Sequence, residues 1–286
     1  MHYWYILPLH LTNIEENESD FKLVNINTDP TFSSAGHFVI KPNSLLFSNL
    51  NSNSLDNKIY TIYSKHNLEV LTLQGSLEAY KNGKLDSNAY ALFIEDAGNS
   101  RTTSIKATGK IVGNIFAPLG NLDIIGGSWN VPIYNPLSLT TLNAFQITNS
   151  GKLILNAKKN ENGEILHSKI FLNNYLALNK AKILVNIDDN SSLFFVGDKL
   201  EGVISYNRLL GNNIYHSIYS NLISNSYMLE FTPEFLDNKL NLIVKTEKTF
   251  EEVLTKDKDI GEILDIAKNE GSKAFFKEEP TEPEPT

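Results

Sequence analysis

Short segments in which apolar and polar residues alternate run through the middle of the chain, and they constrain its fold more than any other feature. The alternation is clear over 68–80, 104–115, 152–157 and 181–187. A period of two residues is typical of a β-strand that buries one face and exposes the other. Because the segments are short and numerous, we predict an all-β protein.

Turn-forming residues separate these segments. Asn and Gly adopt positive φ at low cost, so clusters of them mark places where a chain turns. The clusters are Asn82–Gly83, Gly98–Ser100, Gly120–Asn121, Asn149–Gly151, Asn162–Gly163 and Asp188–Asn190. Strands that recur every 8–12 residues or so fit a sandwich, a barrel or a solenoid.

The apolar centres between 119 and 156 recur about every 20 residues, which is within the range of an architecture with one coil per repeat. We therefore predict a β-helix or solenoid, with a β-sandwich as the alternative. Ile154, Leu184 and Ile243 are expected to lie on the apolar, buried phase of their strands.

The pattern divides the chain into four parts. Residues 1–67 are expected to form an N-terminal cap or irregular β region, with a Ser/Asn-rich loop at 47–54. Residues 68–246 form the solenoid with its terminal stem. Apolar residues at a spacing of three to four predict short helices over 247–273. The acidic, Pro-rich residues 274–286 are expected to form a disordered tail.

Charge and composition exclude several classes of function. The formal net charge is −8, and only two arginines occur, so the chain lacks the basic face of a nucleic-acid-binding protein. It contains no cysteine, which excludes disulfides, thiolate metal sites and a cysteine nucleophile. No apolar run approaches the roughly 20 residues of a membrane-spanning helix. Residues 1–11 lack the basic start and cleavage site of a signal peptide, so we expect a strand or a cap there.

The run from Ser168 to Thr246 resembles the end of a bacterial autotransporter passenger (type V secretion). The resemblance covers about two thirds of the chain and depends on several short segments. These are Leu172–Asn179, Leu184–Ile187, Asp198–Ile204, and the pair Tyr227–Phe231 and Leu240–Val244, which is similar to the hairpin that ends many passengers. The loose Asn- and Lys-rich rungs are similar to passengers of the vacuolating-toxin-like group.

This resemblance implies a right-handed parallel β-helix outside the cell or at the bacterial cell surface. It implies adhesion or toxin-like interaction with a host-cell or bacterial surface protein or glycan. In that family an outer-membrane barrel follows in a longer precursor, and we expect no membrane span in this chain. The absence of cysteine agrees with the family, because threading through a barrel disfavours crosslinked chains.

Candidate catalytic residues are few. The six histidines show no metal-ligand spacing, and they are His2, His10, His37, His66, His167 and His216. The adjacent acidic pairs Glu95–Asp96 and Asp188–Asp189 are the only ones in the strand-rich region, and the second follows a strand where a turn is expected. We expect turn roles for these carboxylates, although a polysaccharide-cleaving β-helix enzyme would use such a pair.

Aromatic residues could form a sugar- or protein-binding surface, but packing along the strands is the plainer interpretation. They are Trp129, Tyr134, Tyr206, Tyr215, Tyr219 and Tyr227. We predict a protein that is not an enzyme, with no catalytic residue, cofactor or metal, which acts by presenting surface. The alternatives are the polysaccharide-degrading enzyme and a β-sandwich adhesin module.

Overall fold

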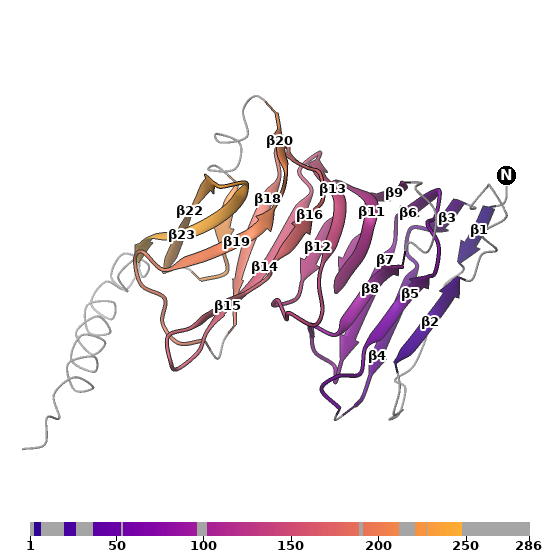
Figure 1. Ribbon diagram of the computed structural model, residues 1–286, viewed down its shortest axis with the longest axis horizontal. Helices are drawn as coiled ribbons and strands as arrows, with labels where there is room; N and C mark the ends of the chain where they lie inside the picture. The colour runs from indigo at the N-terminus through magenta and orange to yellow at the C-terminus, as the bar shows by residue number, and fades with distance from the viewer. Residues whose placement is uncertain are drawn as a thin grey trace, which may run out of the picture.

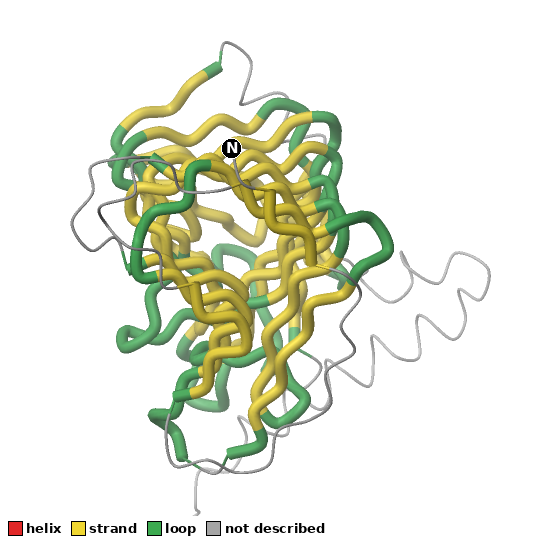
Figure 2. The backbone as a smooth tube through the Cα atoms, turned by 90° about the vertical axis from the view of Figure 1, so that its right-hand side faces the viewer, coloured by secondary structure: helices red, strands yellow, loops and turns green. Residues whose placement is uncertain are grey.

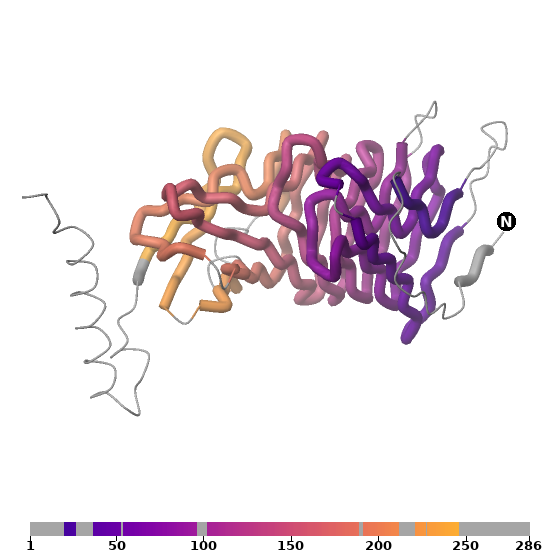
Figure 3. The backbone as a smooth tube through the Cα atoms, turned by 90° about the horizontal axis from the view of Figure 1, so that it is seen from below, coloured from indigo at the N-terminus to yellow at the C-terminus, as the bar shows by residue number. Residues whose placement is uncertain are grey.

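The computed structural model describes residues 3–6, 20–26, 37–52, 54–95, 102–188, 191–211, 221–226 and 228–247. All regular elements in these ranges are β-strands, and none is a helix that could cross a membrane. The strands stack along the long axis of the molecule, with the N-terminal strands at one end and the C-terminal strands at the other (Figures 1 and 3).

The strands form two sheets, one of 15 strands and one of 8. The larger sheet contains two rows of stacked strands, and the smaller sheet is a third row. The first row contains β1 (Tyr3–Ile6), β3 (His37–Ile40), β6 (Val70–Leu73), β9 (Thr103–Ala107), β11 (Asn114–Ile125), β13 (Thr141–Thr148), β17 (Tyr175–Leu178) and β20 (Arg208–Leu210). The second row contains β4 (Leu45–Leu50), β7 (Ser76–Lys81), β10 (Lys110–Val112), β12 (Ser128–Val131), β14 (Lys152–Lys159), β15 (Ile165–His167), β18 (Lys182–Ile187) and β21 (Leu222–Ser224). The third row contains β2 (Phe21–Ile26), β5 (Ile59–Ser64), β8 (Ala89–Ile94), parts of β11 and β13, β16 (Ile170–Leu172), β19 (Lys199–Ser205), β22 (Leu229–Leu236) and β23 (Lys239–Glu247).

The chain visits the three rows in a fixed order, and one such passage is called a coil below. β3, β4 and β5 form one coil, and β6, β7 and β8 form the next. Apart from the antiparallel pairs made by β15, β22 and β23, successive coils pair in parallel, so that Phe38, Leu71 and Ile105 are aligned. β11 bends and belongs to two rows, with its register shifting between Ala117 and Asn121. The rows surround an interior that is seen end-on in Figure 2.

The core is the interior between the rows. Six of the second-row strands each point one residue into it at the same register position, and these residues are Leu46, Leu77, Ile111, Trp129, Leu153 and Ile183. They are at most 2% exposed and belong to one apolar cluster, which also receives side chains from the other two rows. Burial of a large apolar side chain contributes about 1.5–3 kcal/mol, so this cluster is the main source of stability.

The buried phase differs from the sequence-based prediction at Ile154, Leu184 and Ile243. All three residues are only partly buried, because they lie on the outer side of their strands. Their neighbours are the buried residues, and they are Leu153, Leu155, Ile183, Val185, Leu242 and Val244. The error arose because β14, β18 and β23 each carry runs of consecutive apolar residues, so apolarity alone does not reveal the inward phase.

The chain before Leu68, where we expected a cap or an irregular β region, contains regular strands. β2 pairs with β5, and β4 pairs with β7, both in parallel. The loop predicted at 47–54 is also wrong in part, because β4 continues to Leu50. The parallel stack therefore extends through both sides of the boundary proposed at 67/68.

The C-terminal strands close the stack with an antiparallel hairpin at the position expected from the sequence. β22 pairs with β23, and β23 pairs antiparallel with β19. Asp237 and Asn238 connect the two strands with φ of 50° and 57°, a backbone conformation that Asp and Asn tolerate better than most residues. The helices predicted over 247–273 and the tail at 274–286 lie outside the described residues, apart from Glu247 at the end of β23.

The revised burial phase predicts different costs for two adjacent substitutions in β14. Leu153→Ala should lower the free energy of unfolding by about 2–5 kcal/mol, because it leaves a cavity in the core. Ile154→Ala should cost about 1 kcal/mol or less, since that side chain lies on the outer side of the strand and is partly exposed. Urea unfolding followed by tryptophan fluorescence measures both. Equal losses in the free energy of unfolding for the two variants would contradict the assigned inward and outward positions of Leu153 and Ile154.

Candidate functional site

A polar groove runs along the corner between the second and third rows, and it consists of two adjoining hollows. The first hollow has a volume of about 750 Å³ and is lined by Lys84, Leu85, Asp86, Ser87, Ile133, Tyr134, Asn135, Pro136, Asn156, Asn186, Ile187, Asp188 and Asn225. The second has a volume of about 740 Å³ and is lined by Ser52, Ser54, Leu55, Asp56, Lys58, Lys81, Asn82, Asp86, Ser87, Asn88, Asn135 and Leu137. Because the two hollows share Asp86, Ser87 and Asn135, we treat them as one corner groove.

An asparagine ladder forms part of the first hollow. β14 and β18 are in register, so Asn156 and Asn186 are neighbours on the outer side of the second row. The Asn186 Nδ2 group donates to Asn156 Oδ1 at 2.8 Å, and Asn156 Nδ2 donates to Asn130 Oδ1 at 2.7 Å. In the next coil, Asn225 bonds the backbone N–H and C=O of Ile187 at 2.7 and 2.9 Å. These bonds fix the amide groups before any ligand arrives.

Loop-to-loop hydrogen bonds form the wall of the groove. The loop after β12 lies against the loop before β8, where Asn135 Nδ2 donates to Ser87 Oγ at 3.3 Å and Ser138 Oγ donates to Asn88. Asp86 is held in place because its Oδ1 accepts the backbone N–H of Asn88 at 2.7 Å. The wall is therefore built from segments about 50 residues apart in sequence.

A buried lysine organises the second hollow. Lys81 is 5% exposed, and its Nζ donates to the carbonyl oxygens of Ser54 at 2.6 Å and Asn57 at 3.0 Å. Asn82 Oδ1 accepts the Ser52 N–H at 2.9 Å, and Asn82 Nδ2 donates to the Ser52 carbonyl at 3.0 Å. Since a buried ammonium group needs several acceptors, these carbonyls explain the conformation of the loop between β4 and β5.

The groove carries charges of both signs. Lys84, Asp86 and Asp188 line the first hollow, and Asp56 and Lys58 line the second. Such a surface offers amides, hydroxyls, carboxylates and ammonium groups together, without one dominant sign. It is suited to a ligand rich in hydrogen-bonding groups and low in net charge.

The structure separates most of the acidic and aromatic residues that the sequence singled out. Asp188 lies at the groove, whereas Glu95 is exposed just beyond the end of β8. Trp129 is fully buried and donates to the Gly113 carbonyl at 3.0 Å, so it serves the core. Tyr206 is also buried. Asp96, Asp189, Tyr215, Tyr219 and Tyr227 lie outside the residues whose side chains are described.

Tyr134 is the one aromatic candidate that the structure places at the groove. Its ring packs against Phe171 with centroids 5.7 Å apart, and Lys169 Nζ lies 5.1 Å from the Tyr134 centroid. The ring is partly exposed, so it can contribute an apolar surface to a bound ligand.

The described histidines are dispersed. His37 Nε2 lies 4.0 Å from Glu69 Oε1 on the outer surface, while His66 and His167 are buried. Within the described ranges, no group of three or more His, Asp or Glu side chains could hold a metal ion. His2, His10 and His216 have no described side chain.

Sequence analysis missed an aromatic cluster on the outer side of the third row. Tyr60, Tyr63, Tyr90, Phe93 and Phe116 pack across β5, β8 and β11 in both stacked and edge-to-face pairs, with centroids 4.7–5.7 Å apart. Burial, together with a hydrogen bond to Glu95, raises the pKa of Tyr63 to about 12. The three tyrosines are less than 9% exposed, so the cluster acts as a second small core.

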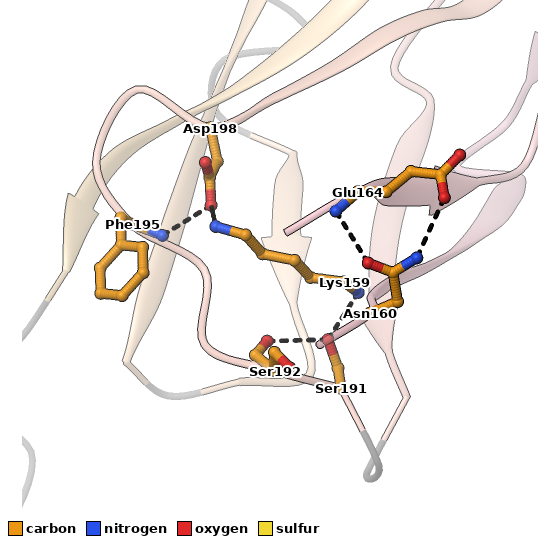
Figure 4. A network of polar contacts seen from close by, with 7 residues as sticks. All are labelled: Lys159, Asn160, Glu164, Ser191, Ser192, Phe195 and Asp198. Carbon is orange, nitrogen blue, oxygen red and sulfur yellow. Dashed lines mark hydrogen bonds and ion pairs between the residues drawn. The ribbon is translucent and has the colours of Figure 1, made fainter. Parts of the chain in front are cut away.

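A second surface feature lies near the C-terminal end of the stack. The loop before β19 exposes three large apolar side chains, Leu193, Phe195 and Val196, which are 60%, 53% and 61% exposed. Beneath them, Lys159 Nζ lies 2.6 Å from Asp198 Oδ2, and the same oxygen accepts the Phe195 N–H at 2.8 Å (Figure 4). This ion pair holds the loop against β14.

Comparison with known proteins gives no relative for this chain. No family model matches it, and neither the curated proteins nor the solved structures searched contain a match. The resemblance to autotransporter passengers therefore depends on the sequence motifs alone.

His167 provides a test of the packing beside the groove. Burial lowers its pKa to about 4, although the Ser168 carbonyl, 2.9 Å from Nδ1, opposes the shift. The unfolded chain binds this proton below pH 6.5, whereas the folded chain does not bind it until about pH 4. Stability is therefore lost as the pH falls from 6.5 to 4, by about 3 kcal/mol in total.

Urea unfolding at several pH values measures this loss. The His167→Gln variant serves as the control, because it retains a polar side chain that does not titrate. Its free energy of unfolding should decline less than that of the wild type over the same pH interval. Parallel declines in the two proteins would show that His167 is not buried in its neutral form.

Proposed function

We propose that this chain is a right-handed parallel β-helix that acts as a surface-exposed or secreted, autotransporter-passenger-like protein. It serves adhesion or toxin-like interaction with host or bacterial surfaces. The observation that carries the proposal is the in-register parallel stack ended by the β22–β23 hairpin. Parallel crossovers are right-handed in about 98% of cases, which supports the handedness.

The outer surface supports a role in presentation. The corner groove and the apolar loop at 193–196 both lie outside the core, and both are held by specific hydrogen bonds or ion pairs. A stack of coils orders such features along one axis, which suits extended ligands and multiple weak contacts. The ligand would be a surface protein or a glycan, with no nucleic acid involved.

One observation favours a second candidate, a polysaccharide-degrading β-helix enzyme. Asp86 and Asp188 line the same hollow, and glycoside hydrolases use a pair of carboxylates on opposite sides of the scissile bond. The β-sandwich alternative is less favoured, because parallel pairs predominate and the only antiparallel pairs among the described strands are β14–β15, β19–β23 and β22–β23.

A cell-binding assay tests the proposal. The fluorescently labelled, folded chain should bind host or bacterial cells in a saturable manner. A heat-unfolded sample and an unrelated β-helix of similar net charge should bind at background level, because they lack the arranged surface. Equal binding by all three samples would leave only non-specific adhesion and would remove the proposal.

The enzyme alternative is separated by reducing-sugar release from a panel of polysaccharides. Turnover that is abolished in both Asp86→Asn and Asp188→Asn would place the enzyme first. We expect no release by the wild-type chain.

A further inference from the structure

We infer that the corner groove binds a neutral, extended oligosaccharide. This inference deepens the proposed function, since it gives the presented surface a class of ligand. It follows from the shape of the groove, its charge, and the hydrogen-bonding groups that the described residues leave available.

The groove is elongated. Its lining residues extend from Ser52 beside β4 to Asn225 beside β21, which is the full length of the second row. The seven main strands of that row are separated by six steps of about 4.8 Å, so the groove extends over roughly 29 Å. Such a shape suits a linear chain better than a compact ligand.

The available polar groups match hydroxyl groups. Asn186 uses one amide hydrogen in the ladder, and no described residue bonds its carbonyl oxygen. Asp86 Oδ1 accepts one backbone hydrogen, and no described partner bonds its Oδ2. A sugar hydroxyl both donates and accepts, so it can satisfy an amide and a carboxylate at neighbouring positions.

The charge of the groove disfavours polyanions. Three aspartates line the two hollows, and they are Asp56, Asp86 and Asp188. Three lysines also line them, but Lys81 already donates to backbone carbonyls. A sulfated or uronic-acid-rich glycan would need an excess of cations, which these residues do not supply.

The groove is also ordered before binding. The ladder from Asn130 to Asn186 and the contact of Asn135 with Ser87 fix the side chains, which lowers the entropy lost on binding. Tyr134, which lines the first hollow and is partly exposed, supplies apolar surface for the C–H side of a sugar. The groove, lined mainly by polar residues, offers few apolar pockets for the side-chain anchors on which many protein ligands depend.

Isothermal titration calorimetry of the full chain with neutral hexasaccharides tests the inference. The probes are cellohexaose, chitohexaose and mannohexaose, with a heparin hexasaccharide as the anionic comparison. At least one neutral probe should bind, and heparin should not. The variants Asn186→Ala and Asp86→Asn should each weaken that binding by about fivefold or more, because each removes a contact to the sugar.

Asn143→Ala is the matched control. Asn143 also belongs to an outward asparagine pair, since its Nδ2 donates to Asn121 Oδ1 at 2.7 Å, but it does not line the groove. Its affinity should stay within about twofold of the wild-type value. Thermal unfolding by circular dichroism identifies a variant that has lost its fold. Asp86→Asn is chosen because it is nearly isosteric and should leave the fold intact.

Three results would overturn the inference: no binding of any neutral hexasaccharide, binding of heparin alone, or equal affinity in the groove variants and Asn143→Ala. The cell-binding assay is run on the same samples. Cell binding without hexasaccharide binding removes the inference and leaves the proposed function standing. Hexasaccharide binding that the groove variants weaken, without cell binding, supports the inference and removes the proposed function.

Discussion

Backbone hydrogen bonds between successive coils, made where the chain turns from the first row into the second, hold the architecture together. The N–H of Lys110 donates to the Gly75 carbonyl at 3.1 Å, and the N–H of Ser128 donates to the Gly109 carbonyl at 3.0 Å. The coils approach so closely there that a Cβ atom on Gly109 would lie 1.8 Å from the Gly75 oxygen. Glycine is needed at this corner because there is no space for a Cβ atom. The close approach of the coils keeps the strands on either side in register.

The same stacking produces the candidate site. Because β14 and β18 are in register, Asn156 and Asn186 become neighbours on the outer side of the second row. Asn156 also donates to Asn130, whose register partner is Ile154, and this bond extends the ladder to β12. The loops between the second and third rows lie beside one another for the same reason, and they enclose the corner groove. The register of the coils therefore determines which outward side chains and loops are neighbours on the surface. An ordered surface of this kind supports a function in binding.

The sequence predicted strands at 68–80 and 152–157 and the closing hairpin, because alternation and turn residues are local signals. It did not predict the inward phase at Ile154, because apolar residues occupy both phases of that strand. It also did not predict the groove. Aligned residues are separated by 34 positions between Leu71 and Ile105, but by 17 between Ile105 and Leu122. Without a constant repeat, the sequence does not show that Asp86 and Asn186 line one hollow.

Parallel, in-register stacking is the central claim, and disulfide trapping tests it most directly. The chain has no cysteine, so an introduced pair reports on one distance alone. Ile154 and Leu184 are register partners on the outer side of β14 and β18, about 4.8 Å apart, within the range that a disulfide spans.

The double variant Ile154→Cys, Leu184→Cys should form an intramolecular disulfide on mild oxidation. The pair Ile154→Cys, Asn186→Cys, offset by two residues and roughly 8 Å apart, should stay reduced. A disulfide in the offset pair, or none in the aligned pair, would contradict the stack.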